Sequence, residues 1–128
     1  MRALLDTHSF IWSHTLDDRL SEHALQLIED GANDLLLSAV TVWEIAIKYG
    51  LGRLPLPEAP GEYVQKRVAV QALTPLAIDF SHALAAGGLP NHHSDPFDRL
   101  LVAQAQVEAV PIITSDANIA QYDVEVIW

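Results

Sequence analysis

The chain contains no cysteine, few basic residues and no long uninterrupted apolar run. The absence of cysteine excludes disulfide scaffolds, thiol nucleophiles and every cysteine-ligated zinc, haem or iron–sulfur site. No apolar run approaches the roughly 18 residues that a membrane-spanning helix needs, so we expect no membrane segment. Asp6 stands where a signal peptide would keep its apolar stretch, and a cytoplasmic location is therefore predicted.

Basic side chains are scarce: 7 lysines and arginines stand against 17 aspartates and glutamates, a formal net charge of −10. A protein of this charge does not coat nucleic acid by bulk attraction, because such binding depends on many cations meeting phosphates. Any nucleic-acid role would have to be local. It would use a few basic residues, or metal ions that reverse the sign of an acidic pocket.

What the chain does have is enough apolar material for a core: 50% of its 128 residues are hydrophobic. We predict a single domain over residues 1–128. Short apolar runs without alternation are typical of strands buried on both faces, and helical patterns between them indicate an α/β fold with a parallel sheet. The predicted strands are 3–5, 35–37, 76–78, 111–113 and 124–127.

Helix boundaries are marked by capping residues and by glycine or proline. Ser21 and Asp79 are N-cap residues, and Asp95 followed by Pro96 opens a helix in the way that helix N-termini favour. Prolines between residues 54 and 60 indicate a surface connection. The predicted helices are 22–29, 39–49, about 62–71, 80–86 and 97–107.

Two aspartates stand at or just after the ends of predicted strands. Asp6 ends the first apolar run, and Asp116 comes shortly after the run at 111–113. The carboxyl ends of parallel strands share one edge of the sheet, so these two side chains can lie side by side there. The alternative is that each aspartate caps the short helical stretch that follows it.

Two further acids stand on predicted helices against an apolar background. Glu44 lies in a segment that is apolar almost all round, where an ionised carboxylate needs a partner. An ion pair with Lys48, four residues on, is the alternative for Glu44. Asp98 heads a core-facing stripe of apolar residues, and for Asp98 the alternative is a first-turn acid favoured by the helix dipole.

Together, Asp6, Glu44, Asp98 and Asp116 form a candidate cluster of carboxylates. Carboxylates packed together repel one another and must take up protons or recruit cations. Mg²⁺ and Mn²⁺ prefer oxygen ligands and are commonly held by a few carboxylates, water and substrate phosphate. Such sites cleave phosphate esters, because the metal lowers the pKa of a bound water and steadies the leaving oxygen.

A few other residues are candidates to support this cluster. Lys48, Arg53 and Arg99 lie close to it in sequence and are predicted to guide a substrate strand. The hydroxyls of Thr7 and Ser115 are predicted to hold the carboxylates or to contact the substrate. The six histidines show no metal-binding spacing; His93 is retained as a substrate contact only.

Four motifs in this order resemble a PIN-domain protein of the VapC toxin type. They are residues 4–8 (LLDTH), 42–48 (VWEIAIK), 93–101 (HSDPFDRLL) and 114–116 (TSD). The resemblance runs from end to end and implies a three-layer α/β/α fold around a mainly parallel sheet. One departure is Ser94, because close relatives often carry a basic residue there.

The resemblance also implies an activity: a Mg²⁺- or Mn²⁺-dependent endoribonuclease. By the family pattern, Asp6, Glu44, Asp98 and Asp116 would be the metal-binding catalytic acids, with Asp95 as an accessory ligand. An RNA substrate, a small antitoxin protein and a homodimer are the partners that it implies.

Our leading hypothesis is therefore in-line hydrolysis of an RNA phosphodiester by metal-bound water, giving 5′-phosphate and 3′-hydroxyl ends. One alternative is an acidic-pocket signalling module that binds Mg²⁺ without cutting nucleic acid. Another is a catalytically idle protein whose apolar surface mainly clasps an antitoxin.

Overall fold

A computed structural model describes residues 1–15 and 17–128. Its sheet has five strands in the order β3-β2-β1-β4-β5, and every neighbouring pair is parallel. The strands are β1 (Arg2–Leu5), β2 (Asp34–Ser38), β3 (Thr74–Leu76), β4 (Ile112–Ile113) and β5 (Val126–Ile127). The helices are α1 (Thr7–Thr15), α2 (Glu22–Glu29), α3 (Ala39–Gly50), α4 (Pro60–Val70), α5 (Phe80–Gly87), α6 (Pro96–Glu108) and α7 (Ala117–Ala120).

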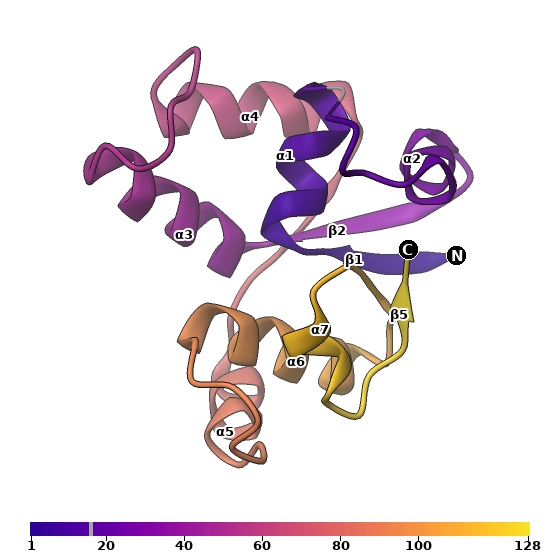
Figure 1. The fold of residues 1–128 in the computed structure, drawn as a ribbon, viewed down its shortest axis with the longest axis vertical. Helices are drawn as coiled ribbons and strands as arrows, with labels where there is room; N and C mark the ends of the chain where they lie inside the picture. Colours follow the sequence, from indigo (N-terminus) through magenta and orange to yellow (C-terminus); the bar gives the residue numbers. More distant parts are fainter. Residues whose placement is uncertain (16) are drawn as a thin grey trace.

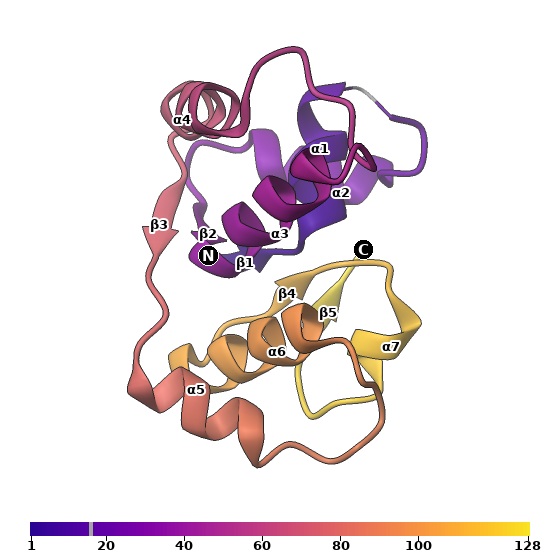
Figure 2. The same cartoon turned by 90° about the vertical axis from the view of Figure 1, so that its left-hand side faces the viewer.

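The helices form two layers, one on each face of the sheet (Figure 1). α1 to α4 cover one face and α5 to α7 cover the other, as Figure 2 shows from the side. The predicted three-layer α/β/α fold is confirmed, and the sheet is parallel throughout the described chain. None of the described helices is long and apolar enough to cross a membrane.

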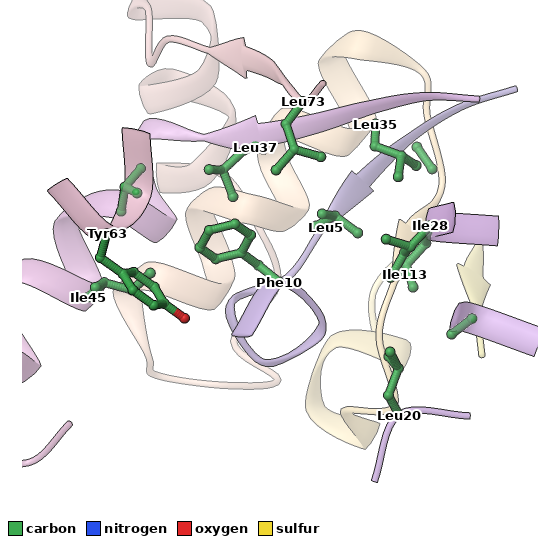
Figure 3. Close-up of a cluster of buried hydrophobic side chains, with 13 residues drawn as sticks. Leu5, Phe10, Leu20, Ile28, Leu35, Leu37, Ile45, Tyr63, Leu73 and Ile113 are labelled. Carbon is green, nitrogen blue, oxygen red and sulfur yellow. The ribbon is translucent and has the colours of Figure 1, made fainter. Parts of the chain in front are cut away.

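The central strands are buried on both faces, which explains their unbroken apolar sequences. Leu5, Leu35 and Leu37 point into the core beneath α1 to α4 (Figure 3), whereas Leu4 and Leu36 join the core on the other side. Side chains alternate between the faces of a strand, so each leucine run supplies both cores at once.

Most helices begin at the predicted caps. The Ser21 hydroxyl accepts a hydrogen bond from the Ala24 amide, and Asp79 forms a capping box with His82. The α4 helix starts two residues before the predicted 62, because Pro60 takes its first position, where a missing N–H costs nothing.

The third strand departs from the prediction of 76–78: it lies at Thr74–Leu76. Its register explains the shift, because Thr74 pairs with Leu36 and Leu76 pairs with Ser38, the last residue of β2. Beyond Ser38 the chain turns into α3, so residues 77 and 78 have no ladder partner. The strand also lies at the edge of the sheet and is largely exposed. Because it is not buried, its sequence lacks the apolar run that marks the central strands.

Candidate active site

The sheet order creates a switch point between β1 and β4. From β1 the chain continues to β2 on one side, whereas β4 adds on the other side. Open parallel sheets bind ligands outside the carboxyl ends of the strands at such a point. Asp6 follows β1 directly and Asp116 begins α7 shortly after β4, so two carboxylates flank the switch point.

A pocket of about 260 Å³ opens at this edge of the sheet. The four acids of the candidate cluster all line it, and Asp95 lines it as well. These carboxylates come from the end of β1, from α3, from the start of α6 and from the start of α7. The full lining is Asp6, Thr7, His8, Glu44, Lys48, His93, Asp95, Asp98, Asp116 and Asn118.

Asp6 is buried and fixed by two hydrogen bonds. One carboxylate oxygen accepts from the Ser9 amide at 2.8 Å, which caps α1. The other oxygen accepts from the Thr114 hydroxyl at 2.5 Å. The Thr114 hydroxyl also accepts from the Asp116 amide at 2.9 Å and so joins the ends of β1 and β4. The capping role and the pocket position of Asp6 thus coexist.

Glu44 is also buried, with a side chain that is 8% exposed. The Thr7 hydroxyl donates to Oε1 at 2.6 Å, and Lys48 donates to Oε2 at 2.5 Å. The ion pair with Lys48 is therefore present, and both of its members line the acidic pocket. Lys48 compensates the charge of one carboxylate and leaves four others on the pocket wall.

Asp95 and Asp98 meet at the start of α6. Asp95 caps the helix through one oxygen, which accepts from the amides of Phe97 and Asp98 at 2.8 and 3.2 Å. His93 Nε2 lies 3.0 Å from Asp98 Oδ2. Burial raises the pKa of Asp98 from 3.8 to about 6, and the charges of Asp95, Asp116 and Glu44 add to the rise against the opposing His93 bond.

The donor atoms suit a hard divalent cation. Across residues 1–15 and 17–128, one group of three potential ligands has its atoms within 4.8 Å of one another: His93, Asp95 and Asp98. Further carboxylates face the same pocket, and oxygen-rich sites of this kind prefer Mg²⁺ or Mn²⁺. Burial is the main cause of the raised pKa of Asp98, and the repulsion from neighbouring carboxylates that adds to it is what such a cation would relieve.

The predicted substrate-binding residues divide into two sets. Thr7 and Lys48 line the pocket. Arg99 lies elsewhere: its guanidinium donates to the backbone carbonyls of Ala86, Leu89 and Pro90 at 3.0, 3.2 and 2.8 Å. That guanidinium braces the loop between α5 and α6. Arg53 and Ser115 are exposed and lie outside the described lining of the pocket.

Sequence reasoning missed three residues of this site. His8 and Asn118 line the pocket, and Thr114 fixes Asp6. Each stands two residues from a predicted acid, so proximity to Asp6 or Asp116 in the sequence was the available signal. His93 was predicted to contact substrate only, yet its ring nitrogen lies among the potential ligand atoms.

A profile of the PIN domain matches residues 3–125. The chain belongs to the PIN-domain family. Over 67 residues it is 42% identical to Ribonuclease VapC16 of Mycobacterium tuberculosis, a match that covers 51% of this chain and 48% of the relative. The chain thus matches about half of the length of that relative.

Solved structures share the fold of this PIN domain. VapBC2 from Rickettsia felis, crystallised with a promoter DNA fragment, superposes with a TM-score of 0.71 at 14% identity, covering 99% of this chain and 98% of that one. A toxin–antitoxin complex from Klebsiella pneumoniae gives 0.67 at 19% identity, with 98% and 96% covered. FitAcB from Neisseria gonorrhoeae gives 0.63 at 20% identity, again with 98% and 96% covered.

Proposed function

We propose that this PIN-domain protein is a divalent metal-dependent endoribonuclease, the toxin component of a type II toxin–antitoxin pair. The observation that carries the proposal is the convergence of five carboxylates on one pocket at the switch point of the sheet. The relative named as a ribonuclease supports the activity. The structural neighbour from Klebsiella pneumoniae, described as a toxin–antitoxin complex, supports the biological role.

His93, Asp95 and Asp98 would hold a first ion, with Asp6, Glu44 and Asp116 on the same pocket wall. A bound Mg²⁺ or Mn²⁺ supplies positive charge for the phosphate and lowers the pKa of a coordinated water. The protein's own contribution is to fix the acids. The hydroxyl of Thr7 holds Glu44 in place, and the hydroxyl of Thr114 holds Asp6. Because hydroxyls are neutral, these hydrogen bonds orient the carboxylates without cancelling their negative charge.

Lys48 has a separate part in this proposal. Its side chain is 41% exposed while its ammonium contacts Glu44, so it presents a cation at the rim of an acidic pocket. A phosphodiester entering the pocket meets this cation first. We expect in-line hydrolysis by a metal-bound water, which gives 5′-phosphate and 3′-hydroxyl products and needs no covalent intermediate on the protein.

Metal-dependent cleavage of labelled total RNA tests this activity. Wild type should cut with Mg²⁺ or Mn²⁺ and stop when a chelator is added. Asp98→Asn removes one charged ligand, and we expect at least a ~100-fold loss of cleavage with the circular dichroism spectrum unchanged. Asp123→Asn is the matched control, since Asp123 is exposed and does not line the pocket.

Equal cleavage by Asp98→Asn and wild type, or cutting that persists in chelator, would contradict the assignment. Metal binding without cutting would favour the signalling module instead. Neither binding nor cutting would favour the catalytically idle protein.

We also propose a protein partner of the antitoxin kind, a homodimer and action in the cytoplasm. An apolar groove of about 640 Å³ between α3, α4 and β3 supports a protein partner. Trp43 lines this groove and is 57% exposed. Exposed apolar surfaces of this kind mark protein contacts. Co-expression with a small protein encoded beside this chain should give a stable complex in which cleavage is inhibited, measured by size-exclusion chromatography and RNA cleavage.

A further inference from the structure

A second pocket, of about 370 Å³, adjoins the acidic pocket along α1. Thr7, His8 and Lys48 line both, so the two pockets share a wall. We call the second pocket the α1 groove. Its lining is Thr7, His8, Ile11, Trp12, Thr15, Asp17, Arg19, Lys48 and Leu54. A linear polymer whose phosphate occupies the acidic pocket therefore has a continuous path into the α1 groove.

Flat side chains contact one another along this groove. The His8 ring stacks on Trp12, one helical turn away, with ring centroids 5.2 Å apart and planes inclined by 24°. The Arg19 guanidinium lies 4.6 Å from the centroid of Trp12. Asp17 accepts from Arg19 Nε and Nη2 at 2.9 and 2.7 Å and fixes the guanidinium there. Trp12 packs edge-on against Trp128, which anchors the whole arrangement.

The two outer members of this arrangement face solvent. His8 is exposed, and the Arg19 side chain is 69% exposed. Unpaired RNA bases are recognised by stacking on aromatic rings, histidine included, and on arginine guanidinium planes. The α1 groove therefore offers two flat surfaces, the His8 ring and the Arg19 guanidinium, on which bases can stack.

The groove also holds a disproportionate share of the chain's few cations. Two of the 7 basic residues, Lys48 and Arg19, line it, and among the described residues of its lining Asp17 is the acid. Four others are engaged elsewhere: Arg2 with Asp34, Lys66 with Glu58 and Glu62, Arg67 over the Tyr63 ring, and Arg99 with backbone carbonyls. In a chain of net charge −10, cations at the exit of the acidic pocket suit a phosphate backbone.

We propose that the α1 groove receives the unpaired nucleotides next to the scissile phosphate, with a base stacked on His8 and a backbone phosphate at Arg19. This inference rests on the proposed ribonuclease function and makes its substrate a single-stranded or looped RNA. Trp12 is a positioning residue, because it holds the His8 ring and the Arg19 guanidinium in their planes. A protein segment is the competing occupant, and the experiment separates the two.

The test measures binding without cleavage. Fluorescein-labelled hexauridine is titrated with protein in the presence of a chelator, and fluorescence anisotropy gives the Kd. The titration starts at low salt and is repeated at several higher salt concentrations. Arg19→Gln should weaken binding about threefold to tenfold and reduce the slope of log Kd against log salt by about 0.7. His8→Ala should weaken binding about fivefold and leave the slope unchanged, because stacking releases no counterion.

Arg2→Gln is the matched control. Arg2 is half-exposed and paired with an aspartate, as Arg19 is, but it lies at the start of β1, the opposite end of that strand from Asp6. We expect its Kd and salt slope to equal those of wild type. Melting temperatures of all variants are compared first. We expect them to match wild type, because both test positions, His8 and Arg19, are exposed. With Mg²⁺ present, both groove variants should raise KM for a short RNA more than they lower kcat.

Unchanged hexauridine binding in both groove variants, an equal loss in Arg2→Gln, or absence of binding by wild type would overturn the proposal. Variants that bind hexauridine normally but lose a co-purifying protein partner would overturn it in favour of a protein occupant. Failure of the ribonuclease function would look different. Wild type and variants would still show the expected order of Kd values in chelator, but neither wild type nor any variant would cleave RNA when metal is added.

Discussion

The buried polar cluster around His82 and the acidic pocket, both in the part of the chain that the structure describes, are balanced in opposite ways. The first surrounds His82, which is 1% exposed between α5 and α6. The Asp79 amide donates to His82 Nδ1, and His82 Nε2 donates to Glu108. Gln104 accepts from the Ser38 hydroxyl and donates to the Ala77 carbonyl. Here each donor meets an acceptor, and the cluster locks α5 and α6 against the end of β2.

The second cluster is the acidic pocket, where acceptors outnumber donors. Five carboxylates face it, and Lys48, His8 and His93 are the charged or chargeable donors in its described lining. Matched buried networks stabilise a fold, whereas carboxylates in excess repel one another until a cation arrives. The difference between the clusters indicates that the His82 cluster is structural and the acidic pocket is a binding site. Three predictions follow from it, in order of decreasing effect.

Removing a member of the matched cluster should cost the most stability. Gln104→Ala deletes a fully buried side chain and leaves the Ser38 hydroxyl without its acceptor. We expect the free energy of unfolding to fall by about 2–3 kcal/mol in urea denaturation, from the cavity and the orphaned donor together. RNA cleavage per folded molecule should stay at the wild-type level.

Gln106→Ala is the control for this change, since Gln106 is exposed on the same helix. Its effect should stay within about 0.5 kcal/mol. Loss of cleavage in folded Gln104→Ala would mean that the His82 cluster also serves the acidic pocket, and the division between the two clusters would fail.

Much of the fold could be predicted because burial leaves a signature in the sequence. The leucine runs of β1 and β2 are apolar without alternation because both of their faces are covered. Capping residues such as Ser21 and Asp79 fixed helix starts because their chemistry is local. The edge strand β3 was misplaced for the opposite reason: exposure removed its apolar pattern, and its position depends on a register with β2 that only the folded sheet defines.

The acids of the candidate site could be predicted because each stands against an apolar background or directly after a strand. Their contacts could not. The pattern does not say that Asp98 would meet His93, or that Arg99 would turn its guanidinium to backbone carbonyls instead of the pocket. Those outcomes depend on the path of the loop before α6, which periodicity and capping rules leave open.

The burial of Asp98 and the repulsion from its neighbouring carboxylates should appear as a pH dependence of stability. The pKa of Asp98 rises from 3.8 to about 6 in the folded chain, so between these values the folded state binds more protons than the unfolded state. Stability of the metal-free protein should therefore fall as the pH rises from about 4 to 6. A shift of this size corresponds to at most about 3 kcal/mol, which we reduce to about 1–2 kcal/mol because the side chain is 20% exposed.

Asp98→Asn should remove this penalty. In chelator at pH 8, urea denaturation should show the variant about 1–2 kcal/mol more stable than wild type, with a flatter dependence of stability on pH between 4 and 6. Asp123→Asn should show neither change. Addition of Mg²⁺ should stabilise wild type more than the variant, since a ligand that binds the folded state raises its stability. A variant less stable than wild type at pH 8 would show that burial and the neighbouring carboxylates do not destabilise the ionised form of Asp98.

The smallest effect concerns Lys48, the donor that neutralises Glu44. Lys48→Gln removes the ion pair but keeps a polar side chain at a position that is 41% exposed. In chelator we expect a loss of about 0.5–1 kcal/mol, because a buried carboxylate loses its cation in a partly solvated site. Saturating Mg²⁺ should shrink that loss, since a divalent cation in the same pocket supplies the missing positive charge. Melting temperatures of wild type and variant with and without Mg²⁺ measure the difference. An equal loss of stability with and without Mg²⁺ would mean that the Glu44–Lys48 pair is structural, like the His82 cluster, and that Glu44 does not interact with a bound metal.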